Sequence, residues 1–284
     1  MIVADDHELA AAARGSRLLG RVITLARWIG GGRPVSRRGE LIPPDARALA
    51  DVLGLSGDLA EAGGHGKLTD LRDVPRLTMA FYLAVETELI AVRRSGIRPG
   101  PRIGDCDRLD RGPDADAVAL GLWEELFDLT ARRAAVPPAD PEPLLDAVSD
   151  WAGRWGPHAL GVLYERQAAV DLAELTAGLV SEEHVTADEQ PAKGVLLAAL
   201  LGLTVRAALA ELADHGAVTI TTPIPHDTQP ATPAAPALAA IRLPEWVLDD
   251  DAGITVRLTP LGTWAVRRAL LAEGAHAPAT RALT

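Results

Sequence analysis

Residues 89–98 constrain the fold of this chain more than any other stretch. They read Leu-Ile-Ala-Val-Arg-Arg-Ser-Gly-Ile-Arg, with two short β-prone runs on either side of Ser95-Gly96. Two such runs around a Ser-Gly pair predict a β-hairpin. Several arginines lie on this hairpin, so it is basic as well as short. The segments that precede it indicate the domain to which it belongs.

Three helices are predicted before the hairpin. Apolar residues at helical spacing predict the first over residues 16–29, and the glycines at 30–32 end it. The pair Pro43-Pro44 opens the second helix, over 43–53, and Pro75 opens the third, over 75–88. Three helices followed by a basic hairpin is the order of elements in a winged helix-turn-helix module.

The second half of the chain repeats this order. A long apolar helix is predicted over 194–214, followed by a strand at 217–222, a hairpin with strands at 246–248 and 254–258, and a closing helix that Thr259 caps and Pro260 begins. The Pro-, Thr- and Ala-rich residues 223–240 predict a flexible insertion between the first strand and this hairpin. Without a gap, residues 77–92 and 203–218 are identical at six of 16 positions. We therefore interpret the chain as a tandem duplication.

A proline-rich segment separates the two halves. Residues 113–134 predict a further helix, and residues 136–143 contain four prolines, which exclude a regular helix or strand there. We predict a mainly α-helical fold with small β-hairpins, in which two winged-helix-like lobes are joined by helices. The lobes span residues 1–111 and 144–284, and the connecting helix and linker span 112–143.

Charge is distributed unevenly between the two halves. Of the net −11, residues 1–111 contribute +2 (17 Arg or Lys against 15 Asp or Glu) and residues 112–284 contribute −13 (11 against 24). An acidic chain does not coat nucleic acid along its whole surface. The N-terminal lobe, however, has clustered arginines, and the arginine guanidinium is well suited to bind phosphate.

Double-stranded DNA is therefore a predicted partner of the N-terminal lobe, and the predicted function is that of a DNA-binding transcriptional regulator. The wing and the segment before it would supply phosphate contacts. The third helix offers Arg76 and Thr78 but ends in Glu86 and Glu88, so we do not expect it to be a strong base reader. The candidate residues are Arg37, Arg38, Arg76, Thr78, Arg93, Arg94 and Arg98. We expect no such contact from the second hairpin, because Asp249, Asp250 and Asp251 would repel phosphate.

Two alternatives use the same scaffold without DNA. The arginines could pair with acidic residues of the second lobe, and the acidic lobe could bind a basic protein or form a homodimer. Trp151 and Trp155, one helical turn apart, could line an interface or a small-molecule pocket in the cleft between the lobes. These alternatives describe a protein–protein interaction module and a small-molecule-binding protein.

No catalytic arrangement emerges from the sequence, so we expect neither an enzyme nor a cofactor or metal site. The single cysteine excludes an internal disulfide framework, and Cys106 lies between Asp105 and Asp107, which should raise its pKa. The seven histidines are scattered, without a pair at metal-ligand spacing. Acidic groups such as residues 5–8 and 249–251 are expected to be solvated.

Two stretches resemble a known group of proteins. Residues 26–36 with 45–50, and residues 257–264 (Arg-Leu-Thr-Pro-Leu-Gly-Thr-Trp), are similar to actinobacterial winged-helix-like proteins of uncharacterised function. The resemblance implies tandem winged helix-turn-helix modules and no particular activity.

The N-terminus and the apolar segments bear on localisation. Acidic residues at 5–8 stand where a signal peptide has basic and then apolar residues. The longest uncharged helical run, residues 194–205, is too short to cross a bilayer. We expect a cytoplasmic protein without a membrane anchor.

Overall fold

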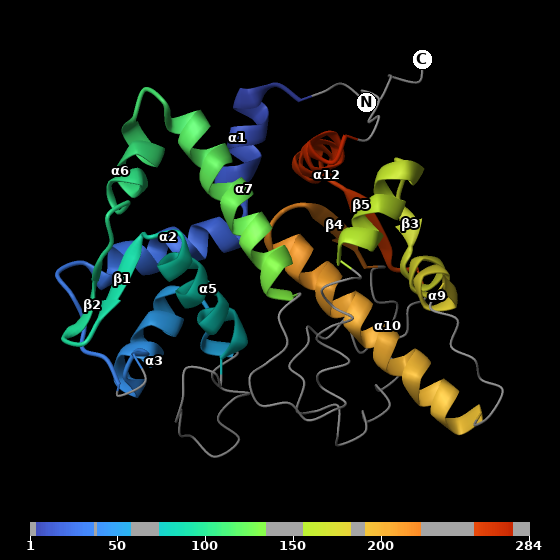
Figure 1. Ribbon diagram of the computed structural model, residues 1–284, viewed down its shortest axis with the longest axis horizontal. Coiled ribbons are helices and arrows are strands. Elements are labelled where there is room, and N and C mark those ends of the chain that lie inside the picture. The colour runs from blue at the N-terminus through green and yellow to red at the C-terminus, as the bar shows by residue number, and fades with distance from the viewer. Residues whose placement is uncertain are drawn as a thin grey trace. The chain divides into compact units, whose positions relative to one another are not determined.

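The computed structural model describes residues 4–36, 39–57, 74–134, 156–182, 191–222 and 253–274 (Figure 1). The chain falls into two compact units. The N-terminal unit is Asp5–Leu129, and the C-terminal unit comprises Met1–Ala4 and Thr130–Thr284. The predicted mainly α-helical fold with small antiparallel sheets is confirmed.

The N-terminal unit is a helical domain with one β-hairpin (Figure 1). Its elements are α1 (Asp6–Gly15), α2 (Arg17–Ile29), α3 (Pro43–Val52), α5 (Pro75–Glu86), β1 (Ile90–Arg93), β2 (Gly96–Pro99), α6 (Gly104–Arg111) and most of α7 (Ala115–Ala134). The three helices and the hairpin predicted from the sequence are confirmed within two residues, whereas α1 and α6 were not predicted.

Ser16 fixes the corner between the first two helices. Its side chain accepts a hydrogen bond from the backbone N–H of Leu19 at 3.3 Å and so caps α2. Its own N–H donates to Ala13 O at 3.1 Å, which ends α1. Helix α2 then buries its apolar side chains against α5 and forms the centre of the unit. The buried side chains of α2 are Leu18, Leu19, Val22, Ile23, Leu25, Ala26 and Ile29.

The hairpin is joined to the segment that follows α2. Arg33 and Ile97 exchange two backbone hydrogen bonds of 2.8 Å each. The segment around Arg33 therefore lies antiparallel to β2, along the edge of β2 that does not pair with β1. Arg93 pairs with Gly96, and the turn is therefore Arg94-Ser95. The sequence had placed Gly96 in the turn. The glycine instead has φ +140° and lets Arg33 approach, since a Cβ there would lie 2.5 Å from Arg33 O.

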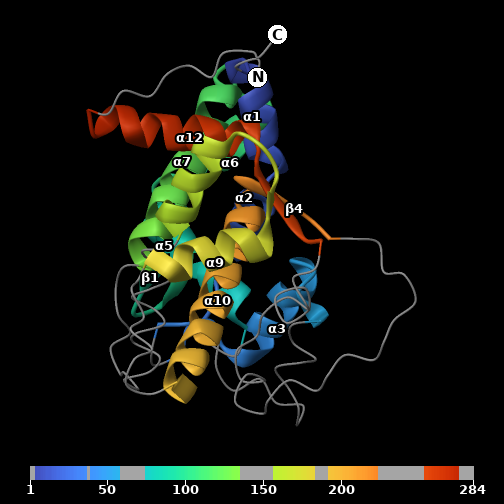
Figure 2. The same ribbon diagram turned by 90° about the vertical axis from the view of Figure 1, so that its right-hand side faces the viewer.

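The C-terminal unit is also a helical domain with a small sheet (Figure 2). It consists of a helix at residues 156–166, β3 (Val170–Asp171), α9 (Leu172–Glu182), α10 (Pro191–Asp214), β4 (Val218–Thr221), β5 (Thr255–Leu258) and α12 (Pro260–Ala272). Its sheet has the order β3-β5-β4 and is antiparallel throughout. Thr259 caps α12 by accepting from Gly262 N at 3.0 Å, as the sequence predicted.

The internal repeat is present, but the alignment predicted from the sequence is shifted by two residues. The pairs Ile90–Pro99 and Val218–Leu258 open the two hairpins, so Ile90 corresponds to Val218. The gap-free alignment had instead matched Val92 with Val218. The helix ends confirm the correction. Glu88 and Gly216 each come after the helix that precedes the hairpin, each has a positive φ (58° and 74°), and each stands two residues before the first paired strand residue. Four of the six identities had come from leucine and alanine, which recur on any apolar helix.

The same correspondence extends to the strand before the second helix. Val170 pairs with Val256 of β5 as Arg33 pairs with Ile97 of β2. Each unit therefore runs helix, short strand, helix, helix and two antiparallel strands, which is a winged-helix-like arrangement. Several predicted segments lie outside the described residues, namely the linker at 136–143, the helical turn that carries Trp151 and Trp155, the insertion at 223–240 and the strand at 246–248.

Two glycine substitutions in the N-terminal unit should have opposite effects. Gly96→Ala should lower the free energy of unfolding by about 2 kcal/mol or more, because the new Cβ would meet Arg33 O in a left-handed backbone. Gly20→Ala, in the middle of α2 with open space around it, should raise that energy by about 0.5–1 kcal/mol. Urea unfolding of both variants measures the difference. Equal effects would contradict the close approach at Gly96.

A buried histidine at the end of α10 should make stability depend on pH. His215 is 1% exposed, and burial lowers the pKa of its imidazole to about 4. The unfolded chain binds this proton with an ordinary pKa near 6.5. The stability that comes from keeping His215 neutral is therefore fully present above pH 6.5 and is lost as the pH falls toward 4.

Between pH 7.5 and pH 5 this histidine should cost the protein about 2 kcal/mol of unfolding free energy. The unfolding free energy of the His215→Gln variant, whose glutamine does not titrate, should fall by about 2 kcal/mol less than that of the unaltered protein over the same pH interval. Urea unfolding curves of both proteins at both pH values give the comparison. An identical loss in the two proteins would show that His215 is not the group responsible.

Candidate nucleic-acid interface

The β1–β2 hairpin has an apolar face and a basic face. Residues opposite one another on paired strands share a face, and neighbours along a strand alternate. The register therefore places Arg93 and Arg98 on one face together with the small residues Ala91 and Gly96. The opposite face carries Ile90, Val92, Ile97 and Pro99. Ile90 and Ile97 are at most 1% exposed, so this second face packs into the core.

The basic face is open to solvent. Arg93 and Arg98 are exposed, and so is Arg94 in the turn between the strands. Within the described part of the chain, none of these three guanidinium groups has an ion pair or a hydrogen bond. Three unneutralised cations on one short hairpin make a positive surface that fits phosphate oxygens. We call Arg93, Arg94 and Arg98 the hairpin arginines.

Several arginines elsewhere in the same unit are paired with acids. Arg14 lies 2.7 Å from Asp116 of α7, and Arg102, in the turn before α6, lies 2.7 Å from Glu125 of α7. Other pairs join Arg27 to Asp110 at 2.5 Å and Arg108 to both Asp105 and Asp114. These arginines tie α1, α2 and α6 into the unit. Pairing with acids thus occurs inside the N-terminal unit, outside the hairpin.

Arg33 is a further arginine that the packing occupies. Its guanidinium carbon lies 4.0 Å from the centre of the Trp28 ring, and its Nη2 donates to Trp28 O at 3.4 Å. A cation stacked on an indole face is stabilised by the ring quadrupole. Arg33 therefore belongs to the packing that joins the end of α2 to the sheet.

The candidate base-reading helix α5 offers little open polar surface. Arg76 and Thr78 are both half-buried. The Thr78 hydroxyl already donates to Val74 O at 3.2 Å within the helix. The exposed residues at the other end of the helix are Glu86 and Glu88, which repel phosphate. This helix is poorly suited to contact base edges.

Four of the predicted site residues lie outside the described residues. They are Arg37, Arg38, Trp151 and Trp155. Gly39, which follows the two arginines in the chain, does lie beside the hairpin, since a Cβ on it would be 3.4 Å from Cγ1 of Val92.

The cysteine and the N-terminal acids have structural surroundings. Cys106 is 1% exposed, and burial raises the pKa of its thiol to about 11, with smaller contributions from neighbouring aspartates. The predicted direction is confirmed, although burial is the main cause. Asp5 caps α1 by accepting from Glu8 N at 2.8 Å, so it is not merely solvated. His7 lies 2.7 Å from Asp116, and this hydrogen bond raises the pKa of His7.

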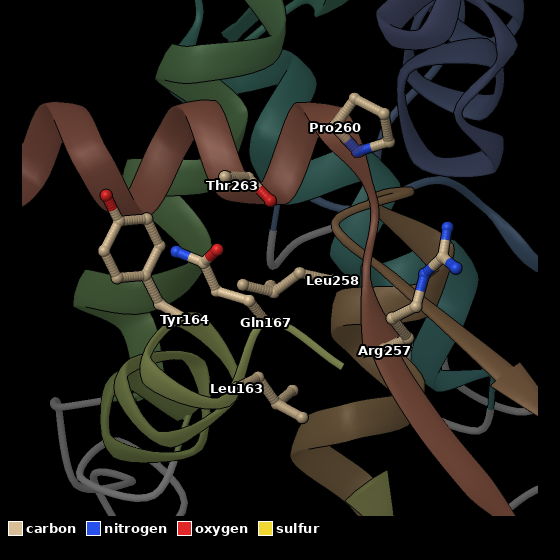
Figure 3. Close-up of a pocket in the computed structure, with 7 residues that line it drawn as sticks. All are labelled: Leu163, Tyr164, Gln167, Arg257, Leu258, Pro260 and Thr263. Atoms are coloured by element: carbon tan, nitrogen blue, oxygen red, sulfur yellow. The ribbon is translucent and has the colours of Figure 1, made fainter. Parts of the chain in front are cut away.

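The C-terminal unit contains a pocket that the sequence did not predict. It has a volume of about 230 Å³ and lies among the helix at 156–166, β5 and the start of α12 (Figure 3). The lining residues are Leu163, Tyr164, Gln167, Arg257, Leu258, Pro260 and Thr263. Strand pairing brings residues together here from positions about 90 apart, so no local motif could have revealed them. The described residues include no cluster of His, Cys, Asp and Glu that could hold a metal ion.

No protein family, curated protein or solved structure matches this chain. Among the helices of the described residues, none is both long enough and apolar enough to cross a membrane.

Proposed function

We propose that the N-terminal unit binds double-stranded DNA through the hairpin arginines, as part of a DNA-binding regulator. The observation that carries this proposal is a contrast within one unit. Arg14, Arg27 and Arg102 pair with acids elsewhere in the unit, whereas the hairpin gathers three exposed arginines that have no ion pair to any described residue. The resemblance to tandem winged-helix proteins is consistent with this function.

The geometry of the hairpin favours contact with the phosphate backbone. Arg93 and Arg98 are diagonal neighbours on one face, because Arg93 pairs with Gly96 and Arg98 pairs with Ala91. Diagonal positions are about 7–8 Å apart between backbones, so two long side chains can reach separate phosphates. The small residues opposite them leave the surface low enough for the backbone of a duplex to approach.

The chemistry predicts binding with weak dependence on base sequence. Phosphate contacts position a protein on a duplex but carry no sequence information. Helix α5, the candidate base reader, exposes Glu86 and leaves Arg76 and Thr78 half-buried. The hairpin alone would therefore bind many duplexes with similar affinity.

Salt dependence gives a quantitative test. Three phosphate contacts should make log Kobs fall with log salt concentration with a slope of about −3, and five contacts, including Arg37 and Arg38, with a slope of about −4.5. The double variant Arg93→Gln/Arg98→Gln should reduce the steepness by about 2. Fluorescence anisotropy of a labelled 20-base-pair duplex, with salt varied from about 25 to 200 mM, measures the slopes.

Arg111→Gln provides a matched control. Arg111 is exposed at the end of α6, away from the hairpin strands, and its removal changes the net charge by the same amount per residue. The control should keep the slope within about one unit of the unaltered protein. Absence of binding at the lowest salt concentration would overturn the proposal, and would leave a protein–protein interaction module as the reading to pursue by affinity capture. An equal effect of the control and the double variant would also overturn it.

A further inference from the structure

The pocket of the C-terminal unit has a buried, mainly apolar floor and an exposed rim. Leu163, Tyr164 and Leu258 are at most 8% exposed and form the floor. Gln167 and Pro260 are exposed and lie at the rim. Figure 3 shows the Gln167 side chain between Tyr164 and Leu258. A mainly apolar cavity with a few polar groups at its edge is the usual form of a small-molecule site.

The side chains that face the pocket carry no charge. Arg257 and Leu258 are neighbours on β5, so their side chains point to opposite faces of the sheet. Leu258 belongs to the floor, and Figure 3 shows the Arg257 guanidinium on the far side of the strand from Gln167. No other lining residue is ionised at neutral pH. An ion that entered would lose hydration without gaining a counter-charge, so the pocket selects an uncharged ligand.

Gln167 holds a backbone conformation that favours glycine. It follows the helix at 156–166 with φ +50°, and it is three residues before Val170. The corresponding residue of the N-terminal unit, three before Arg33, is Gly30, with φ +48°. The C-terminal unit therefore keeps a side chain at a helix end where its repeat has glycine, although positive φ is unfavourable for a residue with a Cβ. That side chain lines the pocket.

The corresponding place in the N-terminal unit is bridged by an arginine. Arg27 corresponds to Tyr164, and its Nη2 lies 2.5 Å from Asp110 Oδ2 and 2.6 Å from Cys106 O, both on α6. The guanidinium thus joins α2 to the helix that follows the hairpin. In the C-terminal unit the helix that follows the hairpin is α12, and Tyr164 and the start of α12 both line the pocket.

The polar side chains at the pocket complement a carboxamide. The side chain of Gln167 has no hydrogen bond to any described residue, and its amide offers both N–H donors and a carbonyl acceptor. The Thr263 hydroxyl donates to Thr259 O at 2.9 Å, so toward a ligand it can only accept. A ligand carboxamide can accept from the Gln167 amide and donate to either oxygen, whereas a ketone or an ester offers no donor.

We infer that this pocket binds a small uncharged aromatic molecule that carries a carboxamide, with the amide on Gln167 and the ring on the floor formed by Leu163, Tyr164 and Leu258. The volume fits this size, because a cavity of about 150 Å³ is enough for one benzene ring. The remaining space of the 230 Å³ pocket accommodates the amide. The site belongs to the C-terminal unit alone and does not depend on DNA binding by the N-terminal unit.

Calorimetric titration of the full chain with benzamide, without DNA, tests the inference. Benzamide should bind with a Kd of about 0.1–1 mM. Acetophenone, which has the same shape but no N–H group, should bind about fivefold more weakly. Benzoate, which has the same shape and a negative charge, should bind at least about tenfold more weakly.

Two variants at Gln167 separate recognition by the amide from simple apolar binding. Gln167→Gly should weaken benzamide binding about fivefold and abolish the preference over acetophenone, while it keeps or raises the melting temperature, since glycine relieves the left-handed backbone. Gln167→Glu should reverse the choice of ligand. Its carboxylate can only accept, so this variant should bind the cation benzamidine about fivefold more tightly than benzamide.

Arg166→Gln is the control, because it alters the residue next to Gln167 without touching the lining residues. Its benzamide affinity should stay within about twofold of the unaltered protein. The inference is overturned if benzamide gives no saturable binding up to about 10 mM, or if benzoate or acetophenone binds equally well. It is also overturned if the two Gln167 variants select ligands as the control does.

Discussion

The pairing of a short strand with the second strand of the hairpin organises each unit of this protein. In the N-terminal unit, two backbone hydrogen bonds join Arg33 to Ile97. In the C-terminal unit, Val170 and Val256 hold the same relation. The contact joins the end of α2, or of the helix at 156–166, to a strand that follows two further helices, so it closes the unit around its core. It also fixes which face of the hairpin turns inward, since a shift by one residue would expose Ile97.

The two units use this common frame differently at the same two places. On the hairpin, the N-terminal unit presents Arg93 and Arg98, whereas the C-terminal unit has Thr221 and Arg257 at the corresponding positions. In the N-terminal unit, Arg27 bridges α2 to α6, whereas the C-terminal unit has a pocket beside the corresponding helix at 156–166. One frame thus carries a basic surface in one copy and a small cavity in the other. Divergence of a few side chains is enough for this, because the backbone hydrogen bonds that hold the frame do not depend on them.

Sequence reasoning located the elements whose ends carry a local signal. Ser16, Pro43 and Thr259 mark helix starts that the structure confirms. Helix α6 was missed because only Cys106 and Leu109 of its eight residues are buried, and its surface is held by ion pairs. Those partners are distant in the sequence, so no local pattern reveals the helix. Helix α1 was missed for a related reason, as its short apolar stripe is Leu9, Ala10 and Ala13.

The candidate sites, too, depend on contacts between residues that are distant in the sequence, which local patterns do not reveal. The sequence predicted the arginines of the hairpin, but it placed the turn at Ser95-Gly96, which would set Arg93 directly opposite Arg98. Like charges directly opposite one another destabilise a strand pair, and the observed register makes them diagonal instead. The pocket was not foreseen, because the helix at 156–166 and β5, which both line it, come together only through the pairing of Val170 with Val256. Such pairings are a property of the folded chain.

The lengths of the two hairpin connections have a consequence for the order in which the protein folds. Two residues join β1 to β2, whereas residues 222–254, 33 in all, separate β4 from β5. Closing the longer connection costs about 2.5 kcal/mol more chain entropy if it behaves as a flexible loop. The β1–β2 hairpin therefore forms from contacts that are close in sequence, whereas the pairing of β4 with β5 waits for a long-range encounter. The hairpin that can form early thus leaves the ribosome first, ahead of one whose second strand follows 33 residues after the first.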